Sequence, residues 1–182
     1  MAVSDERIHQ SMEVAEELGV RAVIFHTNLI PQLRTASYEE SWLQRNEIYW
    51  KRLLEEYPKR EIYIENMFDY DARMITALAN RLQENERFGI CYDLAHANIS
   101  PTGMDVWAKE IAPYVRHLHI NDNDGFVDSH DAIGDGNIPW EKLSVWRKQW
   151  KHDPSILIEV TGCEKLRKSI RRLEEFGFYE KD

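Results

Sequence analysis

The sequence predicts an α/β protein in which a parallel sheet curls into part of a barrel. Amphipathic segments at helical spacing alternate with short apolar runs, an order typical of βαβ units with right-handed crossovers. No low-complexity linker divides the chain, so we expect residues 1–182 to form a single domain. The expected strands are the runs VIFHTN, IYIEN, ICYDLAH, HLHIND and ILIEV, and each carries an acid or a histidine near its end.

Each expected helix shows an apolar stripe between cap residues. The first should cover residues 4–18, with Ser4 as its N-cap, Gly19 at its end, and Ile8, Met12, Ala15 and Leu18 on one face. Further helices are expected over residues 39–57, 71–86 and 104–113, and from about residue 140. The last helix should begin with a capping box of Thr161 and Glu164 and end at Gly177.

The composition argues against nucleic-acid and membrane partners. The net charge is −9, and the basic clusters at residues 165–168 and 171–172 fall at helical spacing, which favours a solvated helix face over a phosphate-binding surface. No apolar stretch approaches the length of a membrane span, and the N-terminus lacks the apolar centre of a signal peptide, so we expect a cytoplasmic protein. Cys91 and Cys163 form no CxxC pair, and we expect neither to be a nucleophile or a metal ligand.

Polar residues near the strand ends predict a metal site. Side chains alternate along a strand, so the last polar residue of each run should share a face with the residue two positions earlier. If these faces point into a barrel, four ligands converge at its C-terminal mouth: Glu65, Asp93, His119 and Glu159. Oxygen and imidazole ligands suit a divalent ion such as Mn, Mg, Co or Zn. The alternative is that each residue only bonds a neighbouring loop.

A second group of polar residues is expected around this centre, to contact substrate or hold a second metal ion. It consists of His26, His96, Asp128 and His130, the last two within a long polar loop over residues 121–140. His96 could instead cap the following helix. We expect His117, one layer deeper than His119, to be a hydrogen-bonded core histidine, and the glycines of IGDGN to form a plain turn.

The order of these motifs carries a resemblance to a known family. IYIENM, GICYDLAHAN, HLHINDNDG with DSHDAIGDGNIPW, and ILIEV resemble the xylose-isomerase-like TIM-barrel superfamily, which includes sugar phosphate isomerases/epimerases and apurinic/apyrimidinic endonucleases (AP endonuclease family 2). The resemblance implies a partial TIM barrel with about five of eight βα units, because the first three strands of the family have no counterpart before Ser4. It also implies that Glu65, Asp93, His119 and Glu159 hold the shared divalent metal, and that His96 contacts substrate or a further metal.

The activity that the resemblance favours is isomerisation or epimerisation of a small sugar or sugar phosphate, a small-molecule carbohydrate substrate. Glu65 and Glu159 would then exchange a proton at the carbon next to a metal-bound carbonyl. The alternative is an endonuclease-like zinc phosphodiesterase, because both groups of polar residues together resemble nearly the full ligand set of those enzymes. A non-catalytic barrel fragment is the third possibility, since five strands are too few to close a barrel. We expect that a homo-oligomer could cover the open face.

Overall fold

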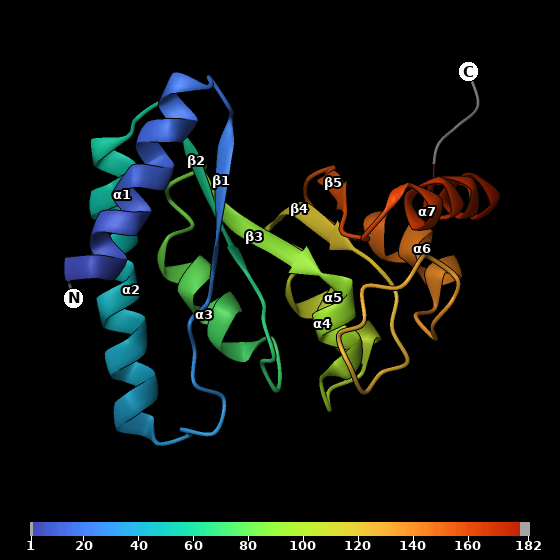
Figure 1. Cartoon of the computed structure of the whole chain (residues 1–182). Coiled ribbons are helices and arrows are strands. Elements are labelled where there is room, and N and C mark those ends of the chain that lie inside the picture. The colour runs from blue at the N-terminus through green and yellow to red at the C-terminus, as the bar shows by residue number, and fades with distance from the viewer. Residues whose placement is uncertain (1, 179–182) are drawn as a thin grey trace.

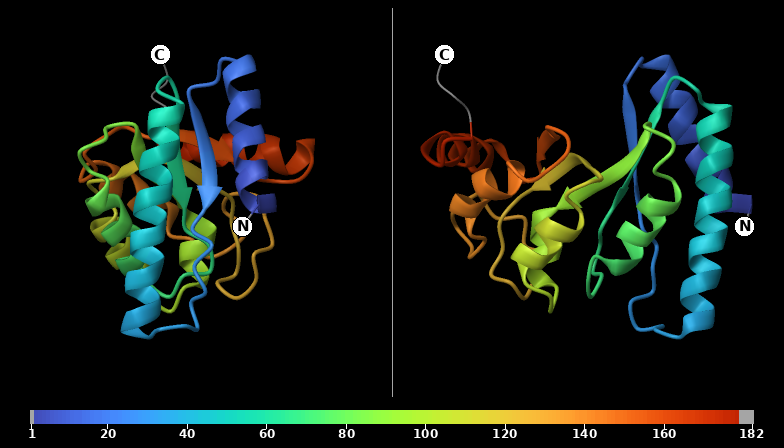
Figure 2. Two further views of the ribbon diagram at one scale, coloured as in Figure 1. Left: turned by 90° about the vertical axis from the view of Figure 1, so that its left-hand side faces the viewer. Right: turned by 180° about the vertical axis from the view of Figure 1, so that it is seen from behind.

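The computed structural model describes residues 2–178 and contains one sheet of parallel strands in the order β1-β2-β3-β4-β5. The strands are β1 (Ala22–His26), β2 (Glu61–Glu65), β3 (Phe88–Asp93), β4 (Val115–Ile120) and β5 (Ser155–Ile158). Sequential order with helical crossovers is the topology of a TIM barrel, so the partial barrel predicted from the sequence is confirmed. In Figures 1 and 2 the strands form an arc, with helices along its outer side.

The helices are α1 (Ala2–Glu17), α2 (Ala36–Glu56), α3 (Arg73–Arg81), α4 (Leu94–Ile99), α5 (Met104–Glu110), α6 (Leu143–Arg147) and α7 (Cys163–Glu175), with a short 3-10 turn η1 (Trp140–Lys142) before α6. The basic clusters of the sequence lie on α7 and are mostly exposed, as expected for a solvated helix face. None of the helices in the described part of the chain combines the length and apolar composition that spanning a bilayer requires.

Three details of the predicted helix ends are wrong. The first helix begins at Ala2, so Ser4 lies inside it, and Leu18 is 72% exposed rather than part of the buried stripe. The N-cap of the last helix is Gly162, with a φ of 91° that glycine adopts readily. No side chain caps this helix, so Thr161 and Glu164 form no capping box. A cap residue contributes only about 1 kcal/mol, so the packing of the whole helix can outweigh it, and Leu18 lies beyond the end of its helix at Glu17.

The hydrophobic core lies between the sheet and the helices on its outer side. Ile64, Tyr92 and Leu118 point outward from β2, β3 and β4 and are buried, and Trp107 of α5 belongs to the same buried cluster. Tyr92 and Trp107 stack with their ring centroids 6.2 Å apart. This packing fixes which residues of each strand face outward, and the alternation of side chains therefore turns the polar residues of the same strands inward.

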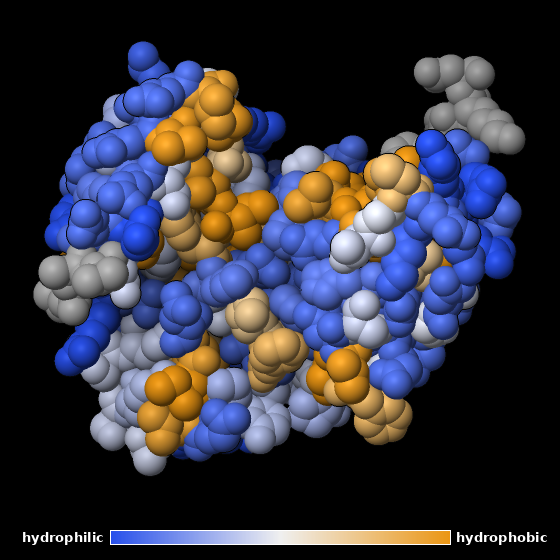
Figure 3. Space-filling view, in the orientation of Figure 1, coloured by the Kyte–Doolittle hydropathy of each residue, from blue (hydrophilic) through white to orange (hydrophobic). Residues whose placement is uncertain are grey.

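The inner face of the sheet is open. Ser155 and Leu157 of β5 are exposed there, and an open cavity of about 460 Å³ is lined by residues that include Ile24, Tyr63 and His117. Figure 3 shows the molecule notched between its β1 and β5 ends, with apolar surface on both sides of the notch. Assembly of copies over this face stays a prediction.

Candidate metal centre

Four polar side chains from four strands meet at the C-terminal ends of the sheet. Glu65 and Asp93 are the last residues of β2 and β3, His119 is the penultimate residue of β4, and Glu159 directly follows β5. One ligand atom from each lies within 4.8 Å of the ligand atoms of the other three. The four residues proposed as metal ligands from the sequence are therefore brought to one point.

His119 lies at the centre of this group. Its Nδ1 is 3.2 Å from Glu65 Oε2 and 3.5 Å from Glu159 Oε1. Glu65, Asp93 and His119 are 4%, 0% and 6% exposed, whereas Glu159 is only half-buried. Three carboxylates within such a small, mostly buried space need a positive charge to offset their repulsion. Within the described chain, every ion pair they make is with a histidine.

The pKa values reflect this crowding. Burial raises the pKa of Asp93 to about 6, although His96 opposes the shift. Burial alone would raise the pKa of Glu65, but the neighbouring imidazoles, His119 foremost, hold it below its usual value. Burial alone would lower the pKa of His119, but the nearby carboxylates, Glu65 foremost, raise it. A bound cation would likewise offset the negative charge of these carboxylates.

The donor set fits a divalent cation. Asp93 Oδ2 and the His119 Nδ1 atom that faces Glu65 and Glu159 are buried without a hydrogen-bond partner among the described residues. Buried polar atoms are nearly always satisfied, so atoms of this kind that face one another indicate a missing ligand. Three carboxylates and one imidazole suit a hard or borderline ion such as Mn, Mg, Co or Zn.

The second group of predicted residues lies around the same point. Asp128 Oδ2 is 3.2 Å from both His96 Nε2 and His130 Nε2. His26 Nε2 is 3.7 Å from Glu65 Oε2, although the His26 side chain is more than half exposed. The structure thus brings all four to the rim of the centre, as second-metal or substrate contacts would require.

The short helix α4 begins at the centre itself. Asp93 is its N-cap, because the Asp93 Oδ1 atom accepts a hydrogen bond of 2.8 Å from the His96 backbone N–H. The alternative that His96 caps the helix is therefore wrong. Instead, His96 Nδ1 lies 2.9 Å from the Asn66 carbonyl oxygen, and this contact turns its Nε2 toward Asp128.

Two positioning residues were missed by the sequence analysis. Asn66 is fully buried after β2, and its side chain bonds both the N–H and the C=O of Asp93, at 2.8 and 3.0 Å. Asp122 is fully buried after β4 and accepts hydrogen bonds of 2.8 Å from Gly134 N–H and Trp140 Nε1–H. It anchors the long loop that carries Asp128. The only signal in the sequence was their place, directly after or two residues after a strand.

A family model described as xylose isomerase-like TIM barrel matches residues 3–176. The chain belongs to this family. Among solved structures, a D-tagatose 3-epimerase-like protein is 25% identical and superposes with a TM-score of 0.81 over 97% of this chain and 69% of that chain. The xylose isomerase-like fold therefore extends over nearly the whole described chain.

Two curated relatives match different shares of the chain. The uncharacterized protein MJ1311 of Methanocaldococcus jannaschii is 28% identical over 180 residues, which are 94% of this chain and 61% of that protein. A probable endonuclease 4 of Protochlamydia amoebophila is 27% identical over 119 residues, which are 55% of this chain and 42% of that protein. The chain thus spans about three fifths or less of the length of these two relatives.

Proposed function

We propose that this chain carries the catalytic centre of a divalent-metal-dependent isomerase or epimerase that acts on a small sugar or sugar phosphate. The observation that supports this best is the meeting of Glu65, Asp93, His119 and Glu159 within 4.8 Å at the ends of four strands. The likeness to a D-tagatose 3-epimerase-like protein over nearly the whole chain favours sugar chemistry for the same centre.

Glu65 and Glu159 are the residues that would move the proton. Both reach the same histidine, with oxygens 3.2 and 3.5 Å from His119 Nδ1, so a substrate carbon beside this point would lie within reach of both. The two carboxylates differ in surroundings, because Glu65 is buried and held as an anion by neighbouring imidazoles, whereas Glu159 is half-exposed. A bound divalent cation would supply Lewis acidity that polarises a carbonyl group.

The rim residues would orient the substrate. His96 and His130 both contact Asp128, and the three side chains offer donors and acceptors to sugar hydroxyl groups. His96 is held from behind by the Asn66 carbonyl, so its outer nitrogen has a fixed direction. A polar rim of this kind suits a small hydroxylated substrate better than an apolar one.

The test combines metal binding with proton exchange. Purified protein with Mn²⁺ is incubated in D₂O with a panel of ketohexoses and ketohexose phosphates, and deuterium at the carbon next to the carbonyl is measured by mass spectrometry. Glu159→Gln is expected to lose at least about 100-fold in exchange rate. Glu164→Gln, which alters an exposed carboxylate on α7, is the matched control and should exchange like the wild type. Exchange that persists in Glu159→Gln, or no exchange of any panel member by Mn²⁺-loaded protein, would overturn the proposal.

A zinc phosphodiesterase that acts on abasic DNA is the second candidate, because the residues at the rim are also of metal-ligating type and adjoin the four residues of the centre. His26, His96, Asp128 and His130 add four ligands to the first four, and one relative is a probable endonuclease 4. Elemental analysis separates the candidates, since three zinc ions per chain favour the nuclease and one divalent ion favours the sugar enzyme. Cleavage of an abasic oligonucleotide would decide for the nuclease, and binding without either activity would favour a non-catalytic fragment.

A further inference from the structure

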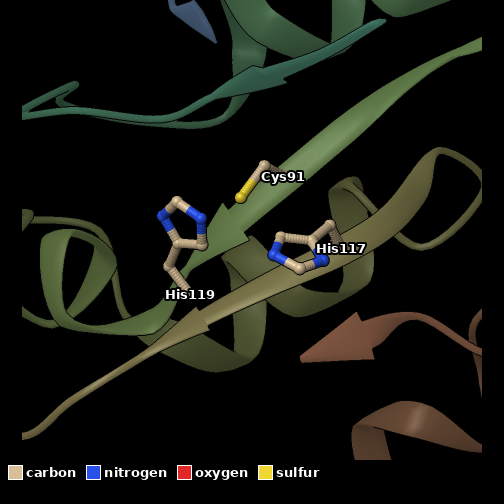
Figure 4. A group of neighbouring side chains, drawn as sticks. All are labelled: Cys91, His117 and His119. Atoms are coloured by element: carbon tan, nitrogen blue, oxygen red, sulfur yellow. The ribbon is translucent and has the colours of Figure 1, made fainter. Parts of the chain in front are cut away.

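A second group of ligand atoms lies one layer deeper in the open barrel. Cys91 of β3 and His117 of β4 face each other across the sheet, and each lies two residues before a ligand of the carboxylate centre. The Cys91 sulfur, one nitrogen of His117 and one nitrogen of His119 all lie within 4.8 Å of one another. Figure 4 shows the three side chains turned toward a common point between β3 and β4.

The nitrogens that face this point are available. His119 uses Nδ1 toward Glu65, and its Nε2 is buried with no hydrogen-bond partner among the described residues. His117 Nδ1 is tied to the Ser155 hydroxyl at 2.7 Å, which leaves its Nε2 to turn inward. An unsatisfied buried ring nitrogen beside a thiol is costly unless a ligand occupies the space between them.

We propose that Cys91, His117 and His119 form a separate binding site for a soft or borderline divalent cation of the zinc class. One sulfur and two imidazole nitrogens are the ligands that such ions prefer, whereas hard ions prefer the carboxylate centre. A tetrahedral zinc ion would place these atoms roughly 3.3–3.6 Å apart. Because His117 is half-buried at the wall of the open cavity, it has room to close the remaining distance.

Charge and access both favour the site. The carboxylates of Glu65, Asp93 and Glu159 lie close enough to Cys91 to attract a cation toward its thiol. A bound cation would replace the thiol proton, which passes to solvent. The cavity lined by Tyr63, His117 and Ser155 provides the entry path from the open inner face.

The two sites share one residue and differ in the rest. His119 offers Nδ1 to the carboxylate centre and Nε2 to the thiol site, while Cys91 belongs only to the thiol site and Glu159 only to the carboxylate centre. A single substitution should therefore abolish metal binding at one site and leave metal binding at the other site intact. Neither Cys91 nor His117 takes part in the proposed sugar chemistry, and a ligand role for Cys91 replaces the expectation from the sequence that this residue binds no metal.

The experiment is a titration with Co²⁺ and Cd²⁺ that follows the thiolate-to-metal charge-transfer absorption. Cys163→Ser is the starting protein, because it removes the exposed second cysteine that could bind metal at the surface. We expect this protein to show the charge-transfer band, and we expect Cys91→Ser or His117→Ala in the same background to lose it. Binding of Mn²⁺, measured by electron paramagnetic resonance, should survive the Cys91→Ser change and thereby show that the variant is folded.

Substitutions at the carboxylate centre complete the test. Glu159→Gln should weaken Mn²⁺ binding and keep the charge-transfer band, whereas His119→Ala should lose both signals. No band in the Cys163→Ser protein, or a band that survives Cys91→Ser, would overturn the thiol site. If none of the proteins binds Mn²⁺ but the Cys163→Ser protein shows the charge-transfer band, the carboxylate centre is rejected and the thiol site is retained.

Discussion

Replacement of Asp122 should show how strongly one buried carboxylate holds the loop at the rim of the metal centre. Its Oδ2 accepts hydrogen bonds from Gly134 N–H and Trp140 Nε1–H, both at 2.8 Å. Its Oδ1 accepts from Ile138 N–H at 3.2 Å and from Asn123 N–H at 3.0 Å. The residue is fully buried, so water cannot replace these contacts without entering the core.

The expected cost follows from these four donors. Hydrogen bonds to a charged group contribute about 1.5–3 kcal/mol each, but relaxation of the loop recovers part of the sum. Asp122→Ala should therefore lower the free energy of unfolding by about 3–5 kcal/mol. Asp122→Asn keeps the shape, but its NH₂ group faces two donors, so we expect a loss of about 2–3 kcal/mol. Asp135→Asn, at an exposed ion pair with Lys168, should cost less than about 1 kcal/mol.

Urea unfolding followed by tryptophan fluorescence measures all three variants, because Trp140 bonds directly to the substituted carboxylate. A free energy of unfolding for Asp122→Asn within about 0.5 kcal/mol of the wild type, as for an ordinary surface substitution, would show that these hydrogen bonds do not hold the loop. Asp122→Ala should also weaken binding of any second metal ion, since the loop that Asp122 anchors carries Asp128 and His130.

Three further substitutions test other parts of the structure. Burial raises the pKa of Asp69 to about 6, so its ionisation lowers the stability of the fold as pH rises from about 4 through 6. Asp69→Asn should therefore be more stable than wild type by about 2–3 kcal/mol at pH 8 but not at pH 4. Equal differences in stability at the two pH values would contradict this. Gly136→Ala should lose about 3 kcal/mol in urea unfolding, because its Cβ would lie 2.1 Å from the Asn123 carbonyl oxygen, and unchanged stability would mean that the loop moves freely. Arg87→Ala should lower the melting temperature, with a cost of about 2–3 kcal/mol, because Arg87 donates to three backbone carbonyls, including that of Leu54 in α2 at 2.6 Å; an Arg87→Lys variant that retained full stability would argue against this account.

Much of the fold could be predicted because hydrophobic periodicity decides it. The strand runs are short, apolar and rich in Ile, and the buried stripe of α3 repeats at Met74 and Leu78 and continues at its C-cap Leu82, so both element types have a clear period. Helix α4 was harder, because Asp93 is at once the last residue of β3 and the N-cap of the helix, and no loop separates the two. Cap residues such as Ser4 misled because a cap preference is weaker than the packing of the whole helix.

The residues of the candidate site that lie on strands could also be predicted from a periodic pattern. Alternation along strands places every second side chain on the inner face, which is a local rule that the sequence contains. Contacts between loops obey no such rule, so no pattern in the sequence places Asn66 beside Asp93 or Asp122 beside Gly134. Cys91 also follows the alternation, but a cysteine within an apolar strand resembles an ordinary core residue. Its proposed role as a metal ligand depends on which nitrogen of His119 faces it.

The kind of acid at each strand end matches the stagger of the sheet. Asp93 and His119 lie directly opposite each other in register, and they set the level of the metal centre. Glu65 pairs with Cys91, one inward-facing step below that level, and Glu159 lies two residues beyond Leu157, the partner of His119, one step above it. One such step is about 6.6 Å along a strand, so the longer glutamate side chains sit where distance must be covered and the shorter aspartate sits at the level itself. Side-chain length thus converts a staggered sheet edge into a compact centre, and this explains why ligands from four strands can meet in so small a space.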